Sequence, residues 1–94
     1  MKPETVKEMT ANQLPKEAMP MNLLGIPVPG TGFGLGFSVR TDKTAELSWS
    51  GMASTFFWIS PKKDLIIIAL EQHIPLALSL EWMVKPTVYG AIKD

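Results

Sequence analysis

The sequence predicts an α+β fold in which an antiparallel β-sheet of three to four strands is flanked by an N-terminal and a C-terminal helix. Three observations predict it. Stretches rich in branched and aromatic residues follow one another between residues 32 and 72, turn-forming residues separate them, and helical patterns lie at both ends. Short connections pair strands as antiparallel neighbours. Ninety-four residues suffice for one domain, so we expect residues 1–94 to form a single domain.

The first expected element is a short helix over residues 3–13. Pro3 suits the first helical position, and Glu4 favours the positive N-terminal end of a helix. Residues 14–30 contain four prolines and two glycines, which is typical of a surface loop with room for a short extended piece.

The stretch GTGFGLGFSV, residues 30–39, has a glycine at every second position. A dinucleotide-binding fingerprint needs Gly-x-Gly-x-x-Gly between a strand and a helix, and this spacing lacks the x-x step. A period of two instead predicts one strand over residues 32–40, with apolar side chains on one face and glycines on the other. A face without side chains indicates that another segment packs on the backbone, and we expect the C-terminal helix to be that segment.

Three further strands are expected over residues 46–51, 54–60 and 65–72. The sequence PKKD, residues 61–64, predicts a tight turn between the last two. The branched apolar run LIIIAL in the last strand predicts burial on both of its faces.

Residues 74–94 have a helical pattern, in which Leu78 and Trp82 share one face. Pro86 lacks the N–H that a helix interior requires, so we expect two helical segments, or one helix with a break near Lys85.

Composition excludes several function classes. Nine basic and nine acidic residues cancel without a basic stripe, so no nucleic-acid partner is expected. The chain has no cysteine and one histidine, His73, for which we expect a solvated position at a strand end; no metal or other cofactor is expected. The polar N-terminus lacks a signal-peptide pattern, and the longest apolar run is too short to span a bilayer. We therefore expect no membrane partner and, by default, a cytoplasmic location.

The apolar content is high for so short a chain. Apolar residues make up 46% of the sequence, including three tryptophans, four phenylalanines and six methionines. A small domain buries a smaller share of its surface than a large one, so part of this apolar surface is expected to face a second copy or a missing part of a larger fold.

Four stretches in order carry a resemblance to a known family: PETVKEMTANQL, GFGLGFSVRTD, SWSGMASTFFWISPKKDLIIIALEQ and VYGAI. They resemble, in turn, the helix before a variable loop, the Gly-x-Gly-x-Gly-Phe/Trp strand, the hairpin region with the third active-site motif, and the close of the last helix in class C β-lactamase-like serine hydrolases. This family includes class C β-lactamases, D-alanyl-D-alanine peptidases and related esterases. The likeness covers roughly residues 3–92 and implies a partial β-lactamase/transpeptidase-like fold.

The resemblance implies one active-site motif in this chain. Trp49-Ser50-Gly51 matches the third motif of the family, Lys-Thr-Gly or a His/Trp-x-Gly variant, on the strand that edges the cleft. In such a site the N–H of Met52 forms one half of the oxyanion hole, Gly51 admits close backbone approach, and Ser50 offers a hydroxyl. Trp49 stands in place of the lysine or histidine of the motif and carries no charge. This departure resembles the esterase-like and peptidase-like branches of the family more than true β-lactamases.

The other two motifs of the family, Ser-x-x-Lys and Tyr-x-Asn, are missing from these residues. The formal match from Ser60 to Lys63 lies in a predicted turn, where the lysine does not share a helix face with the serine and cannot act as its base. Tyr89 is followed by Gly-Ala. The chain is therefore expected to be inactive alone, and whether the ancestral substrate was a β-lactam, a peptide or an ester stays open.

Two functions from different classes remain. The first is a serine hydrolase fragment that a complementing N-terminal chain completes. The second is a stand-alone structural or interaction module that self-associates, since a bare strand edge invites pairing and a symmetric homodimer closes it.

Overall fold

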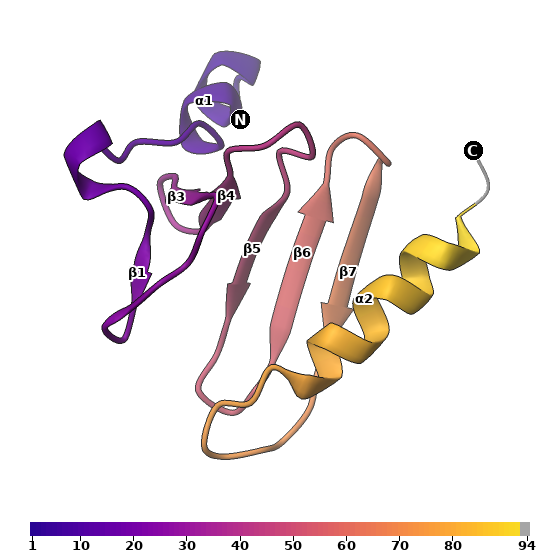
Figure 1. Ribbon diagram of the computed structural model, residues 1–94. Coiled ribbons are helices and arrows are strands. Elements are labelled where there is room, and N and C mark those ends of the chain that lie inside the picture. Colours follow the sequence, from indigo (N-terminus) through magenta and orange to yellow (C-terminus); the bar gives the residue numbers. More distant parts are fainter. Residues whose placement is uncertain (93–94) are drawn as a thin grey trace.

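The computed structural model describes residues 1–92, which fold as an α+β unit and confirm the expected fold class (Figure 1). The helical elements are α1 (Pro3–Met9), the 3-10 turn η1 (Lys16–Ala18) and α2 (Ser79–Ala91). The strands are β1 (Asn22–Leu23), β2 (Ile26–Pro27), β3 (Thr31–Phe33), β4 (Ser38–Arg40), β5 (Leu47–Ser50), β6 (Phe56–Ser60) and β7 (Leu65–Ala69).

The main sheet is an antiparallel meander of five strands in the order β3-β4-β5-β6-β7, and β1 and β2 form a small separate pair. Short turns join β4 to β5 and β6 to β7, as the sequence predicts. In the turn before β5, hydrogen bonds from Thr44 first, and from Arg40 second, hold the pKa of the Asp42 carboxyl well below its ordinary value. The sheet has five strands rather than three to four because the glycine-rich stretch contributes two.

The prediction of one continuous strand over residues 32–40 is wrong. The chain reverses between β3 and β4, so that Phe33 pairs with Ser38. Gly36 has a φ of 134°, which favours glycine, and the N–H of Gly34 donates to the Phe37 carbonyl at 2.9 Å across the turn. Alternating glycines therefore serve a tight hairpin here, although their period is that of a strand.

The N-terminal segment, not the C-terminal helix, packs on these glycines. A Cβ on Gly32 would overlap the Asn12 side chain, and a Cβ on Gly34 would overlap the Met9 carbonyl oxygen. The Leu35 N–H donates to that carbonyl at 3.0 Å. Helix α1 ends at Met9, earlier than expected, because the following residues leave the helix to bind the hairpin.

Helix α2 runs without a break through Pro86, so the expected interruption near Lys85 is wrong. The carbonyl that loses its helical partner belongs to Trp82, a residue that is 70% exposed, where water can replace the lost bond. The same exposure shows that Trp82 does not belong to the packed face of the helix. Residues 93–94 of the expected helical tail lie outside the described residues.

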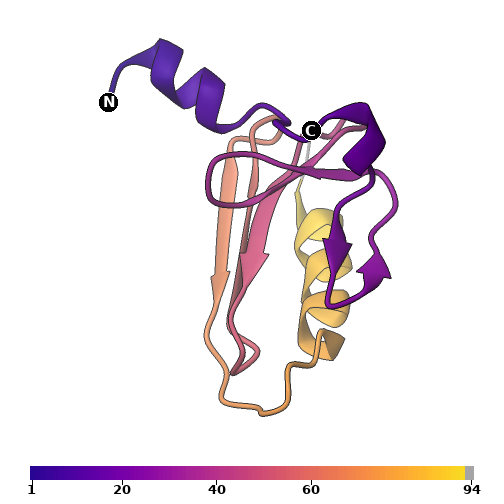
Figure 2. The ribbon, with the colours of Figure 1, turned by 90° about the vertical axis from the view of Figure 1, so that its left-hand side faces the viewer.

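The two faces of the sheet differ in their cover. We call the face of Phe56 and Trp58 the inner face, and α2 lies across it (Figure 2). We call the opposite face, which carries Trp49, Ile66 and Ile68, the outer face. Helix α1 projects from the upper end of the outer face in Figure 2, and an open hollow of about 700 Å³ separates it from the sheet.

Burial follows this cover. Trp58 on the inner face is fully buried, with 0% exposure, whereas Ile66 and Ile68 on the outer face are 66% and 68% exposed. The prediction that the last strand is buried on both faces is therefore wrong. Its branched run is apolar enough for burial, but no described segment covers the outer face of β7.

Candidate functional site

The predicted motif lies where β5 ends, at the lower edge of the sheet in Figure 1. Trp49 and Ser50 are the last residues of β5, where they pair with Phe57 and Phe56 of β6. Gly51 and Met52 begin the turn that leads to β6. All four predicted site residues thus stay contiguous at one strand end.

Three of these residues line an open hollow of about 340 Å³. The lining consists of Trp49, Ser50, Gly51, Thr55, Phe56, Phe57, Ile68 and Leu70. No side chain in this set carries a charge, and aromatic and branched aliphatic groups dominate it. The arrangement suits an apolar or neutral group, held beside an exposed strand end.

Gly51 has a local reason to be glycine. Its N–H donates to the Thr55 carbonyl at 2.8 Å, and its carbonyl accepts the Ser54 N–H at 3.0 Å. A Cβ on Gly51 would lie 2.6 Å from the Thr55 hydroxyl oxygen. A side chain at this position would have to displace the Thr55 hydroxyl, which favours glycine in the turn independently of any ligand.

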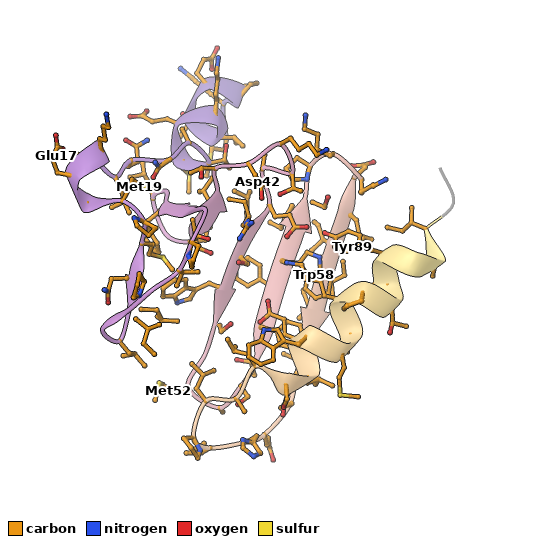
Figure 3. The ribbon with its side chains drawn as sticks, in the orientation of Figure 1. Glu17, Met19, Asp42, Met52, Trp58 and Tyr89 are labelled. Carbon is orange, nitrogen blue, oxygen red and sulfur yellow. The ribbon has the colours of Figure 1, made fainter. Side chains whose placement is uncertain are left out.

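Met52 extends outward at the edge of the molecule, where Figure 3 labels it. Its side chain is 68% exposed. Within residues 1–92, its backbone N–H donates to no acceptor, so it is available to one that arrives from outside. The Trp49 side chain is 38% exposed and meets the Phe33 ring edge-on, with ring centroids 5.3 Å apart.

Ser54 is a structural residue at this site that sequence reasoning missed. Its hydroxyl donates to the His73 carbonyl at 2.7 Å and accepts the Ala77 N–H at 2.9 Å. The serine is 1% exposed and has a φ of 70°. It fastens the segment between β7 and α2 to the turn that carries Met52. No local pattern indicates this role, because the two partners lie about 20 residues further along the chain.

His73 is exposed beyond the end of β7, as predicted for a lone histidine there. Its backbone N–H donates to the Ala53 carbonyl at 3.0 Å, which is a second tie between the same two segments. Among residues 1–92, no three histidine, aspartate or glutamate side chains gather where they could hold a metal ion. None of the helices in this range is long and apolar enough to cross a bilayer.

Neither Ser50 nor Ser60 shares a helix face with a lysine, as the Ser-x-x-Lys motif of the family requires. Within the described residues, the Ser50 hydroxyl makes no hydrogen bond to a basic side chain. Ser60 ends β6 and Lys63 lies in the following turn, so the two do not share a helix face.

Tyr89 serves a different purpose, on the inner face (Figure 3). Its hydroxyl accepts the indole N–H of Trp58 at 3.0 Å and donates to the Glu46 carboxylate at 2.5 Å. The Lys85 ammonium pairs with the same carboxylate at 2.6 Å and lies 5.4 Å from the centre of the Trp58 ring.

Burial first, and the hydrogen bond to Glu46 second, raise the pKa of the Tyr89 hydroxyl above its ordinary value of 10.0. A raised pKa makes this tyrosine a weaker acid, so its phenolate is not available as a base at neutral pH. The cluster instead fastens α2 to the sheet.

No family model matches the chain. Two curated proteins of Mycobacterium tuberculosis are similar to it: the uncharacterized protein MT1414 of strain CDC 1551 and the protein Rv1367c of strain H37Rv. Each is 34% identical over 87 residues, which cover 80% of this chain and 22% of the relative. The chain thus spans about a fifth of the length of the curated relatives it matches. Neither name states an activity.

Proposed function

We propose that this chain forms one wall of a serine hydrolase site of the class C β-lactamase-like type and is inactive alone. The observation that carries the proposal is the hollow at the end of β5, which Trp49, Ser50 and Gly51 line together. Its outer-face part, at Trp49, Phe57 and Ile68, is open, so another polypeptide segment has room there to bring a nucleophile.

In this proposal a complementing N-terminal polypeptide supplies the Ser-x-x-Lys and Tyr-x-Asn motifs. The serine oxygen bonds to the carbonyl carbon of the substrate while the lysine takes the hydroxyl proton. The carbonyl oxygen becomes an oxyanion and accepts a hydrogen bond from the Met52 N–H. The leaving group takes the proton, and water then hydrolyses the acyl ester.

The lining of the hollow favours one class of substrate. A hollow without charged side chains, with Trp49 where other family members have lysine or histidine, offers no cation to pair with a substrate carboxylate. This supports a neutral ester or peptide over a carboxylate-bearing β-lactam.

The first test uses the chain alone. We expect no turnover of nitrocefin or of a p-nitrophenyl ester, and no labelling by a fluorophosphonate serine probe. Labelling at Ser50 or Ser60 would contradict the proposal, because it would place a competent nucleophile within these residues.

The second test uses the chain joined to a polypeptide that carries the two missing motifs. Met52→Pro removes the backbone N–H and is expected to lower ester turnover by about 100-fold or more. Met52→Leu keeps the N–H and serves as the matched control, with turnover unchanged. Equal activity of the two variants, with unchanged circular dichroism, would rule out the oxyanion role.

A second candidate function is a stand-alone module that self-associates. It is favoured by the exposed isoleucines of β7, because apolar patches on a small protein mark interaction surfaces. Light scattering that finds a monomer at high concentration would exclude this candidate and leave the hydrolase proposal untouched.

A further inference from the structure

We propose that β7 is a homodimerisation edge, at which two copies of the chain pair their β7 strands antiparallel about a two-fold axis midway between Ile67 and its copy. The two five-stranded sheets then form one continuous sheet. This inference rests on the second candidate function and gives it a defined surface, partner and register.

The two edge strands of the sheet, β3 and β7, differ in whether another segment of the chain covers them. The β3 edge is covered, because the Phe33 carbonyl accepts the Gln13 N–H at 2.8 Å and the Thr31 carbonyl accepts the Met21 N–H at 2.7 Å. Within residues 1–92, β7 pairs with β6 alone and forms the right-hand edge of the sheet in Figure 1.

The β7 edge also lacks the devices that keep strand edges from pairing. Its sequence, LIIIA, contains no charged residue and no proline. All five residues pair in unbroken register with β6, so no bulge turns the edge away. An uncharged, regular edge of this kind is a template for another strand.

Geometry restricts the register of a symmetric pair. Directly opposed residues of antiparallel strands point to the same face, so a two-fold axis must pass midway between a residue and its own copy. Ile67 is the middle residue of β7, and centring on it pairs the strand over its whole length. Ile66 of one copy then lies opposite Ile68 of the other.

This register joins the exposed apolar surfaces of the two copies. Ile66 and Ile68 are 66% and 68% exposed on the outer face. Both outer faces lie on the same side of the joined sheet, so the four isoleucine side chains form one strip across the axis. Aliphatic cross-strand pairs of this kind stabilise antiparallel sheets.

The ends of β7 are complementary in charge. The turn before the strand holds two lysines and one aspartate, Asp64, which gives it a net positive charge, and Glu71 follows the strand. Antiparallel pairing brings the lysine-bearing turn of each copy beside Glu71 of the other, and symmetry repeats this contact. One carboxylate oxygen of Glu71 is buried and accepts no hydrogen bond within the described residues.

A cysteine cross-link tests the register directly, because the chain contains no cysteine. In Ile67→Cys the two thiols face each other across the axis, with opposed Cα atoms about 4.5–5.5 Å apart, within the range of a disulfide. In the control Ala69→Cys the two cysteines are about 13 Å apart along the strands. We expect mild oxidation to cross-link Ile67→Cys and not Ala69→Cys. Equal cross-linking of both, or of neither, would overturn the register.

A pair of charge variants tests the surface by light scattering over a dilution series. Ile66→Lys with Ile68→Lys places lysines opposite lysines, and the dimer dissociation constant is expected to rise about 100-fold or more. The control, Leu24→Lys with Ile74→Lys, adds the same charge at residues that are 80% and 78% exposed but lie outside β7, and it should leave the constant unchanged. If the β7 variant still dimerises with an unchanged dissociation constant, the β7 interface is wrong, although the chain self-associates by another surface. If the parent chain is a monomer, both the β7 interface and the self-associating module are excluded.

Discussion

The inner face of the sheet at β6 and the outer face at β7 are neighbouring apolar surfaces, yet one is buried and the other is exposed. Trp58 on the inner face is fully buried and stacks on Phe56 with ring centroids 5.8 Å apart. Ile66 and Ile68, on the neighbouring strand, are about two-thirds exposed. Both strands are apolar, so hydrophobicity alone does not decide burial. The difference is α2, which covers one face, while no described segment covers the β7 end of the other.

The proposed site lies on the less covered face. Trp49 points to the outer face and lines the hollow, whereas Trp58 on the inner face is fully buried. A second polypeptide segment can bind to the open part of the outer face, whereas α2 already occupies the inner face. The comparison therefore predicts that variants of the inner face change stability and that variants of the outer face change assembly or activity.

The largest expected effect is that of Trp58→Ala. We expect it to lower the free energy of unfolding by about 3–5 kcal/mol, because a buried indole is replaced by a cavity. The matched change on the outer face, Trp49→Ala, should cost about 1–2 kcal/mol, since that ring is partly exposed already. Urea denaturation of both variants measures the difference, and equal losses would remove the distinction between the faces.

Tyr89→Phe is expected to cost about 2–3 kcal/mol, because the buried Trp58 N–H loses its acceptor and Glu46 loses a donor. The raised pKa of Tyr89 adds a pH dependence. The folded state keeps the hydroxyl proton when the unfolded chain has lost it, so this stability is complete below about pH 10 and falls as the pH rises further.

Urea denaturation from neutral to alkaline pH measures this dependence, and Tyr89→Phe lacks the ionising group. The two proteins should therefore converge in stability above pH 10. Parallel curves for the parent and the variant would show that the hydroxyl does not carry the effect.

The smallest expected effects compare two glycines. Gly34→Ala should cost about 1–2 kcal/mol, because the new methyl group would overlap the Met9 carbonyl and displace the N-terminal segment from the outer face. Gly90→Ala in α2 has nothing within 4 Å of the added group and should stabilise the chain by up to about 1 kcal/mol. Thermal unfolding of both variants measures the difference, and we expect Gly34→Ala to lower the Tm and Gly90→Ala to raise it.

The sequence by itself determined the order of the antiparallel strands from residue 46 onward, the Pro-Lys-Lys-Asp turn and the helices at both ends. These features are encoded locally, because strand period, turn residues and helix-starting residues act on their nearest neighbours. The position of Trp49-Ser50-Gly51 at the end of a strand followed from the same local pattern.

Only the tertiary structure decided the rest. Alternating glycines fit a strand and a hairpin equally well, and contact with Met9 and Asn12 selects the hairpin. Pro86 stays within one helix because the interrupted bond belongs to an exposed residue. The hydrogen bonds of the Ser54 hydroxyl and those of the Tyr89 hydroxyl join residues that lie about 20 to 40 positions apart. Burial and polar pairing depend on which distant segment covers a face, and no local period in the sequence carries that information.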